Sequence, residues 1–235
     1  MRTLKDPQTI IFLVALPLGI VAVTSLINVE GNMVNGYNIN ATVNAVFNAI
    51  AFQFFSGQWL VDYLHRDFSG SVSGRLHAAP ISKLTFFFAT TAGIWVFTIL
   101  QGVLIIAVTT VVFNAYWGNL LITALVFFII SIMAQLLSIL IFLFTRTKGS
   151  GTAVSMVVIF GMMLASGAMF GTFGGVIGDF LATHGTPISL AGRAVLYSGF
   201  VLDDMGNAFF NIAVLSAITT VMAVAVVIIG RRRKI

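Results

Sequence analysis

The chain has 235 residues, of which 59% are hydrophobic and 8% are charged, whereas soluble domains carry about a quarter charged residues. This composition excludes a soluble globular domain. The sequence has no cysteine, so disulfides, thiolate metal ligands and a thiol nucleophile are excluded as well. The formal net charge of +5 does not by itself indicate a nucleic-acid partner, because basic residues beside membrane spans produce the same balance.

Six apolar segments are long enough to cross a bilayer core, which takes about 20 residues of helix. They cover residues 10–27, 41–64, 84–113, 120–144, 153–170 and 208–229. The first segment is longer than the apolar core of a typical signal peptide, and we interpret it as a retained span. The spans and their connections use residues 1–235 as a single transmembrane domain, and the sequence has no GxxxxGK[ST] phosphate loop. We therefore expect any ATPase to be a separate polypeptide.

The basic residues predict the orientation of these spans. With a cytoplasmic N-terminus, 11 of the 12 Lys and Arg residues lie inside, and only Arg193 lies outside. The inside set is Arg2, Lys5, Arg66, Arg75, Lys83, Arg146, Lys148, Arg231, Arg232, Arg233 and Lys234. Because basic residues favour the cytoplasmic side of a membrane, the predicted fold is an all-α integral membrane protein with six transmembrane helices and both ends inside.

Residues 171–206 are the least regular connection between predicted spans. They contain Ile188 to Leu202, an apolar run of 15 residues interrupted by Arg193, which is short for a span. A full span here would also move the C-terminal basic residues to the outside. We therefore expect short re-entrant or interfacial helices in this outer loop, with protein or a water-filled cavity covering their backbone.

The loop between the second and third spans, residues 65–83, is charged and cytoplasmic and carries the most specific pattern. In it an acidic residue and a glycine precede Arg-Leu, and a small residue, a proline and a serine follow. The residues of this pattern are Asp67, Gly70, Arg75, Leu76, Ala79, Pro80 and Ser82. The pattern and the six-span topology resemble the ABC type-2 permease family, the six-span membrane subunits of ABC transporters. Only nine residues precede Ile10, where family members usually carry an amphipathic interfacial helix.

The resemblance implies that the second half of this loop contacts a separate ABC ATPase subunit. Proline limits the backbone there, leucine and isoleucine supply apolar anchors, and basic residues supply charge complementarity. The predicted coupling residues are Arg75, Leu76, His77, Ala79, Pro80, Ile81, Ser82 and Lys83. From the residues alone, an ordinary positively charged cytoplasmic loop is the alternative interpretation.

The family also implies partners and a location. Two copies of the ATPase bind ATP and Mg, this chain itself binds no cofactor, and a second permease copy, identical or different, completes a dimer. The chain is surrounded by the lipid bilayer, and no nucleic-acid partner is expected. The expected location is the cell (plasma) membrane of a bacterium or archaeon, as a multi-pass protein.

Polar and polarisable residues inside two spans are candidates for the substrate path, because in this family the second and fifth spans line the path between two permease copies. The candidates are Asn44, Asn48 and Gln53 in the second span and Met156, Phe160 and Met163 in the fifth. Interhelical hydrogen bonds are the alternative role for the amides, and core packing is the alternative for the methionine and phenylalanine stripe. Gln101 and Gln135, in the third and fourth spans, are expected to pair within the bundle.

Small residues follow the fifth span at regular spacing. Gly167, Gly171 and Gly175 are four residues apart and, together with Phe170, are candidates for a dimer contact or a gate. Simple close packing of helices is the alternative interpretation. The charged residues of segment 171–206 match no metal-ligand spacing, so we predict no metal site and no catalytic residue.

We expect the chain to be the permease subunit of an ATP-driven exporter that forms half of a translocation path. An amphipathic drug, peptide or lipid-like compound is the expected substrate, with a role such as multidrug or antimicrobial resistance. Two alternatives stay open. A secondary transporter needs ion-coupling groups, and the spans carry no Asp, Glu, Lys or Arg away from their ends. The other alternative is a membrane immunity or assembly factor that does not transport.

Overall fold

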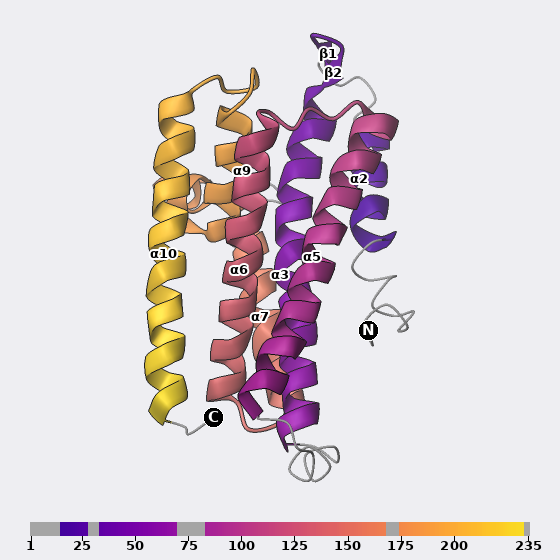
Figure 1. The fold of residues 1–235 in the computed structure, drawn as a ribbon. Coiled ribbons are helices and arrows are strands. Elements are labelled where there is room, and N and C mark those ends of the chain that lie inside the picture. The colour runs from indigo at the N-terminus through magenta and orange to yellow at the C-terminus, as the bar shows by residue number, and fades with distance from the viewer. Residues whose placement is uncertain (1–14, 28–32, 70–82, 168–173, 233–235) are drawn as a thin grey trace.

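A computed structural model describes residues 15–27, 33–69, 83–167 and 174–232. In this part of the chain, long helices stand side by side as a bundle (Figure 1). They are α2 (Leu16–Ile27), α3 (Ile39–Ser69), α5 (Lys83–Phe113), α6 (Leu120–Phe144), α7 (Lys148–Ala165) and α10 (Met205–Arg232). Short elements join them: strands β1 (Met33–Val34) and β2 (Tyr37–Asn38), helix α8 (Val176–Phe180), the π-helix η3 (Leu181–Gly185) and helix α9 (Pro187–Tyr197). The described chain is therefore all-α apart from one small hairpin.

Polar side chains at helix ends determine where two of the long helices begin. Asn119 accepts hydrogen bonds from two backbone N–H groups in the first turn of α6. Thr147 and Ser150 form a capping box at the start of α7. Such caps satisfy backbone donors that have no partner inside the helix. For this reason α7 begins at Lys148, ahead of the predicted start of the fifth span at residue 153.

Helix α3 lies at the centre of the bundle, in contact with α2, α5, α6, α7 and α9. Ala45, Ile50, Phe54 and Leu60 on this helix are buried. Its polar residues are tolerated because protein, rather than lipid, surrounds most of the helix. The helix also runs on to Ser69, so residues 65–69, which were predicted to belong to the loop, are helical.

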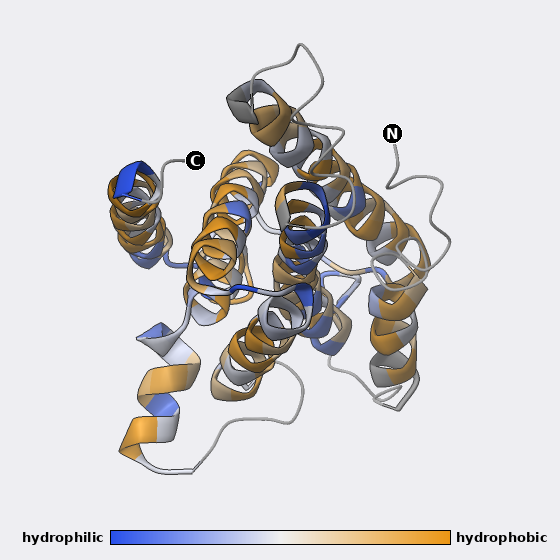
Figure 2. Cartoon of the chain, turned by 90° about the horizontal axis from the view of Figure 1, so that it is seen from below, coloured by the Kyte–Doolittle hydropathy of each residue, from blue (hydrophilic) through white to orange (hydrophobic). Residues whose placement is uncertain are grey.

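Four of the described helices are long and apolar enough to cross a membrane. They are Thr85–Phe113 in α5, Leu120–Phe144 in α6, Lys148–Ala165 in α7 and Met205–Arg232 in α10. Their outward faces carry exposed apolar side chains such as Val111 and Leu121, and hydrophobic residues predominate along the helices (Figure 2). A surface of this kind is suited to lipid and not to water. The all-α membrane fold predicted from the sequence is thus confirmed at this level.

The segment predicted to be re-entrant contains α8, η3 and α9 in its described part. Thr186 caps α9, and Pro187 is its first residue, a position where a missing N–H costs nothing. Helix α9 packs against α3, α6 and α10, and its residues Ile188, Leu190 and Val195 are buried. This burial places α9 inside the bundle, and whether it is a re-entrant or an interfacial helix stays a prediction.

Aromatic rings hold together the connections at the upper end of the bundle in Figure 1. Strands β1 and β2 pair around the turn Asn35–Gly36, which has positive φ at both residues, as a tight two-residue hairpin turn requires. The ring of Tyr37 lies 5.0 Å from that of Tyr116 and 5.8 Å from that of Phe200. These contacts connect the hairpin, the α5–α6 link and the α9–α10 link.

Candidate functional site

Helices α3, α6 and α10 end, and α5 and α7 begin, at the lower end of the bundle (Figure 1). The described basic residues at this end are Arg66, Lys83, Arg146, Lys148, Arg231 and Arg232, which outnumber the acidic residues Asp62 and Asp67. The acidic pair Asp203 and Asp204 lies between α9 and α10, at the opposite end. The described part of the chain therefore has one cationic end, and the connection from α3 to α5 is made there.

The predicted coupling residues belong to that connection. Arg75, Leu76, His77, Ala79, Pro80, Ile81 and Ser82 lie outside the described residues, and Lys83 is the first residue of α5. The structure describes the two helix ends between which this segment runs.

Aromatic residues pack the end of α3 against the start of α5 and the end of α6. The ring centroid of Phe68 lies 6.2 Å from that of Phe86, 6.1 Å from that of Phe87 and 6.2 Å from that of Phe142. The ring of His65 lies edge-on to Phe142 at 4.9 Å. Because closely packed side chains deform little, these contacts hold the three helix ends in a fixed arrangement.

The amide residues proposed for the substrate path lie on α3 in different surroundings. Asn44 is partly exposed, and its carbonyl oxygen accepts a hydrogen bond from the Nδ2 of buried Asn48 at 2.8 Å. The Oδ1 of Asn48 has no hydrogen-bond partner among the described residues. Gln53 is buried between α3 and α5, where its Nε2 lies 3.4 Å from the carbonyl oxygen of Thr98. Gln53 thus contacts another helix of its own chain, while Asn44 lies closer to the surface.

The stripe on α7 is likewise divided between two environments. Met156 and Phe160 are exposed, whereas Met163 is buried. The ring of Phe160 lies edge-on to Phe55 of α3, with 5.5 Å between centroids. Two members of the stripe are therefore open to a second chain, lipid or substrate, and the third packs within the bundle.

The described glycines proposed as a dimer contact or gate lie at the two ends of the connection from α7 to α8. Gly167 has a φ of 70° directly after the C-cap Ser166, the left-handed conformation with which many helices end. Gly175 has a φ of 92° and precedes α8. Phe170 and Gly171 lie outside the described residues. The two described glycines allow backbone conformations that other residues rarely adopt.

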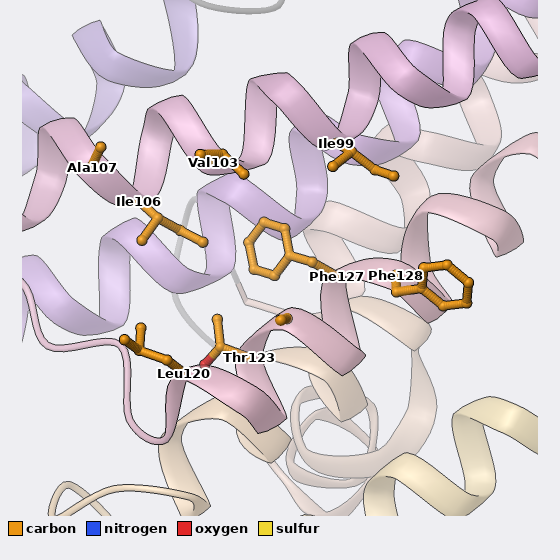
Figure 3. A pocket seen from close by; sticks show the side chains of 9 residues that line it. Ile99, Val103, Ile106, Ala107, Leu120, Thr123, Phe127 and Phe128 are labelled. Carbon is orange, nitrogen blue, oxygen red and sulfur yellow. The ribbon is translucent and has the colours of Figure 1, made fainter.

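A groove between α5 and α6 was not predicted from the sequence (Figure 3). It has a volume of about 380 Å³ and is lined by Ile99, Val103, Ile106, Ala107, Leu120, Thr123, Ala124, Phe127 and Phe128. The hydroxyl of Thr123 donates to the carbonyl oxygen of Trp117, so it is not available to a ligand as a donor. A lining of this kind can hold a hydrocarbon or aromatic group. Its lining comes from two separate spans, so no local sequence pattern indicated it.

Trp95 on α5 lies beside this groove, in contact with one of its lining residues. Its Nε1 donates to the Oγ of Ser131 at 2.8 Å, and its ring lies edge-on to the lining residue Phe128 at 5.6 Å. The hydrogen bond pairs two polar groups that would otherwise be costly in an apolar region. The groove is therefore almost entirely apolar, and nothing in its lining suggests acid–base chemistry. Among the described residues there is also no group of three or more His, Cys, Asp or Glu that could hold a metal ion.

The apolar helices and the cationic end are the features of a multi-pass membrane protein. The family model of the ABC-2 type transporter matches residues 1–172, which is more than half of the 235 residues. The chain belongs to the ABC-2 type transporter family, and it is accordingly a permease subunit that partners with an ABC ATPase. The resemblance inferred from the loop pattern is confirmed. No curated protein and no solved structure matches the chain.

Proposed function

We propose that the chain is the permease subunit of an ATP-driven exporter, contributing half of the translocation path. The observation that carries this proposal is the cationic end of the bundle. The family partner is a soluble ATPase, basic residues favour the cytoplasmic side, and the segment from α3 to α5 is on that side. Residues 75–83 contact the ATPase there, while ATP and Mg are bound by the ATPase and not by this chain.

The same charge distribution supports six spans with both ends in the cytoplasm. The described basic residues at helix ends share one end of the bundle, and Asp203 and Asp204 lie at the other. Arg193, the one basic residue expected outside, lies on α9 and donates from its Nε to the carbonyl oxygen of Ala182 at 3.3 Å. A guanidinium with a backbone acceptor is tolerated near the membrane interior.

The substrate is an amphipathic drug, peptide or lipid-like compound. The apolar groove and the exposed apolar faces of α5 and α7 offer contacts for its hydrophobic part. The described interiors of α5, α6 and α10 carry no Asp, Glu, Lys or Arg, which disfavours proton coupling and hence a secondary transporter.

The transport path runs between two permease copies, identical or different, next to the exposed part of α7. Exposed apolar residues on this helix include Met156, Val157 and Phe160, and a second copy would cover such a face. Asn44, Asn48, Gln53 and Met163 are the further residues proposed to border the path. Gly167, Phe170, Gly171 and Gly175 are proposed to lie at its outer end as a gate.

ATP-dependent transport by the assembled complex tests this function. The permease and its ATPase are reconstituted in vesicles, and uptake of a lipophilic fluorescent dye is followed with and without Mg-ATP. We expect uptake that needs ATP and is lost when the phosphate-loop lysine of the ATPase is replaced. Uptake driven by a proton gradient alone would support a secondary transporter, and stable ATPase binding without any transport would support an assembly or immunity factor.

A further inference from the structure

Asp62 connects α3 to α7 at the cationic end of the bundle. Its Oδ1 accepts a hydrogen bond from the hydroxyl of Thr152 at 2.7 Å. Its Oδ2 lies 3.2 Å from the Nζ of Lys148. The Asp62 side chain is 16% exposed and that of Lys148 is 62% exposed. The carboxylate is thus largely shielded and has both oxygens engaged by the first turns of α7.

The two helices also approach closely at the same level. A Cβ atom added to Gly151 would lie 2.7 Å from Cγ1 of Val61 and 3.0 Å from Nε2 of His65. Nε2 of His65 in turn lies 2.8 Å from Oγ1 of Thr145, in the short link between α6 and α7. Glycine at this position therefore allows contact between helices that a larger side chain would prevent.

These contacts lie close to the segment that the permease uses for coupling. Asp62 precedes Ser69, the last residue of α3, by seven positions, which is about 10 Å of helix. On the other side, the start of α7 is held by the capping box of Thr147 and Ser150. A movement applied to the end of α3 thus meets α7 within two helical turns, in addition to α5 and α6, which contact Phe68.

We propose that Asp62 is a positioning residue of the coupling mechanism. Together with Lys148, Thr152 and the Val61–Gly151 contact, it forms an α3–α7 clasp that makes the two helices move as one body. The clasp passes the movement of segment 70–82 to α7, the helix that carries the exposed residues Met156 and Phe160. This inference rests on the proposed function, because it presupposes an ATPase that moves the segment.

The clasp can be opened without unfolding the start of α7. The hydroxyl of Thr152 also lies 3.0 Å from the carbonyl oxygen of Lys148, so it keeps an acceptor when the carboxylate is removed. Lys148 is mostly exposed and can be solvated. Asp62→Ala should therefore separate the mechanical role of the carboxylate from a role in folding.

Nucleotide-dependent movement of α7 tests the proposal without knowledge of the substrate. Because the chain has no cysteine, a single spin label can be placed by Val157→Cys on α7. A second protein carries the label at Val103→Cys on α5, the helix that follows segment 70–82 in the chain. Both parent residues are exposed, at 73% and 59%. In the complex with its ATPase, both labels should respond to ATP and vanadate. With Asp62→Ala, the α5 response should persist while the α7 population shift weakens about 2- to 30-fold, the range found when coupling networks are mutated.

Asp179→Ala on α8 is the matched control, since it removes an exposed carboxylate far from the clasp along the chain, and both labels should respond as in the parent. Lys148→Gln supplies a second variant, at an exposed position, if Asp62→Ala does not assemble. An α7 response that is unchanged in both clasp variants overturns the proposal. If neither parent label responds and the parent shows no ATP-dependent transport, the proposed function has failed instead.

A covalent substitute for the clasp provides the rescue. In the pair Val61→Cys and Gly151→Cys, the Sγ at position 61 takes the place of the Cγ1 that lies 2.7 Å from a Cβ added at position 151. A disulfide can then bond the two side chains at a separation too short for non-bonded atoms. Oxidation of this pair in the Asp62→Ala background should restore ATP-dependent dye transport, and reductant should abolish it again. Transport that is instead blocked by oxidation in the parent background would show that α3 and α7 must separate during the cycle, which contradicts movement as one body.

Discussion

At the scale of single residues, close helix contacts in this protein depend on glycines, which have no side chain. Gly57 on α3 lies directly against α6. An added Cβ would be 2.8 Å from the carbonyl oxygen of Ala134 and would collide with the hydroxyl of Ser138. Gly93 on α5 has no atom within 4 Å of the same position. The two glycines therefore form a natural pair for comparing a packed site with an open one.

Gly57→Ala should destabilise the protein by about 1–3 kcal/mol, because α3 and α6 must move apart to accept the methyl group. Thermal unfolding of the purified protein in detergent measures the effect. Gly93→Ala should leave the stability unchanged or raise it slightly, since alanine favours helix. Equal effects of the two substitutions would contradict the tight α3–α6 contact.

A second prediction for a single residue concerns the pH dependence of the cap that Asp204 forms at the start of α10. Its carboxylate accepts hydrogen bonds from the backbone N–H of Asn207 at 3.0 Å and from the Nδ2 of Asn207 at 2.6 Å. Both hydrogen bonds lower the pKa of Asp204 below its ordinary value, and the bond from the backbone N–H contributes more than the bond from Nδ2. The ionised form is thus favoured in the folded state, so the stabilisation is present above the unfolded-state pKa and is lost as the pH falls through the lowered pKa.

Hydrogen exchange at the first turn of α10 checks this behaviour. Asp204→Ala should speed exchange there at neutral pH, and the difference from the parent protein should disappear in acid, once the parent carboxyl is protonated. A difference that persists in acid would mean that the charge of Asp204 does not contribute to the cap.

At the scale of elements, the connection between α3 and α5 carries the clearest prediction. Replacing Leu76 or Ile81 with Asp should prevent ATPase binding, because an unpaired charge in a desolvated contact costs several kcal/mol. The helices on either side hold each other through Phe68, Phe86 and Phe87, so the bundle should remain folded. Co-purification of the ATPase at equal membrane levels of permease is the measurement.

Asp179→Ala on α8 is the control for this experiment, since it alters a charge in segment 171–206, outside the α3–α5 connection. It should leave ATPase binding intact. If the Leu76→Asp and Ile81→Asp variants still retained the ATPase and transported normally, residues 75–83 would be an ordinary cytoplasmic loop.

Hydrophobic runs predicted most of the described helices, and caps or contacts with other helices explain where the helices extend beyond those runs. The apolar run of the fifth span begins at 153, but the polar residues from Thr147 onward start the helix earlier through their own hydrogen bonds. The run of the second span ends at 64, yet α3 continues to Ser69 because His65 and Phe68 pack against α6 and α5. Such continuation depends on partners distant in the sequence.

The candidate site was only partly accessible to sequence reasoning. The loop pattern identified the family, and the coupling role of residues 75–83 stays a prediction. By contrast, the helical spacing of Met156, Phe160 and Met163 suggested one common face, whereas the structure exposes the first two and buries the third. The groove between α5 and α6 and the ion pair between Asp62 and Lys148 join residues far apart in sequence. Neither feature has a local pattern that could predict it.

At the scale of the whole molecule, the two ends of the bundle differ in charge, and this predicts which positions react from each side. Single cysteines at Arg146 and Arg232 should be labelled only from the cytoplasm. Cysteines at Val34 and Val176 should be labelled only from outside; both parent residues are exposed in the structure. Labelling of intact cells with a membrane-impermeant maleimide distinguishes the two groups, and reaction of Val176→Cys only after lysis would contradict six spans with both ends inside.

The buried position of α9 has a consequence for how the protein is made. This helix touches α3, α6 and α10, so its binding place is incomplete until α10 has left the ribosome and entered the membrane. Until α10 is in place, we expect the apolar face of α9 to stay unshielded. Packing of α10 against α9 then covers that face. A nascent chain released after Tyr197 would keep that face exposed. We expect membrane quality-control proteases to degrade such a truncated chain faster than one that ends after Arg232.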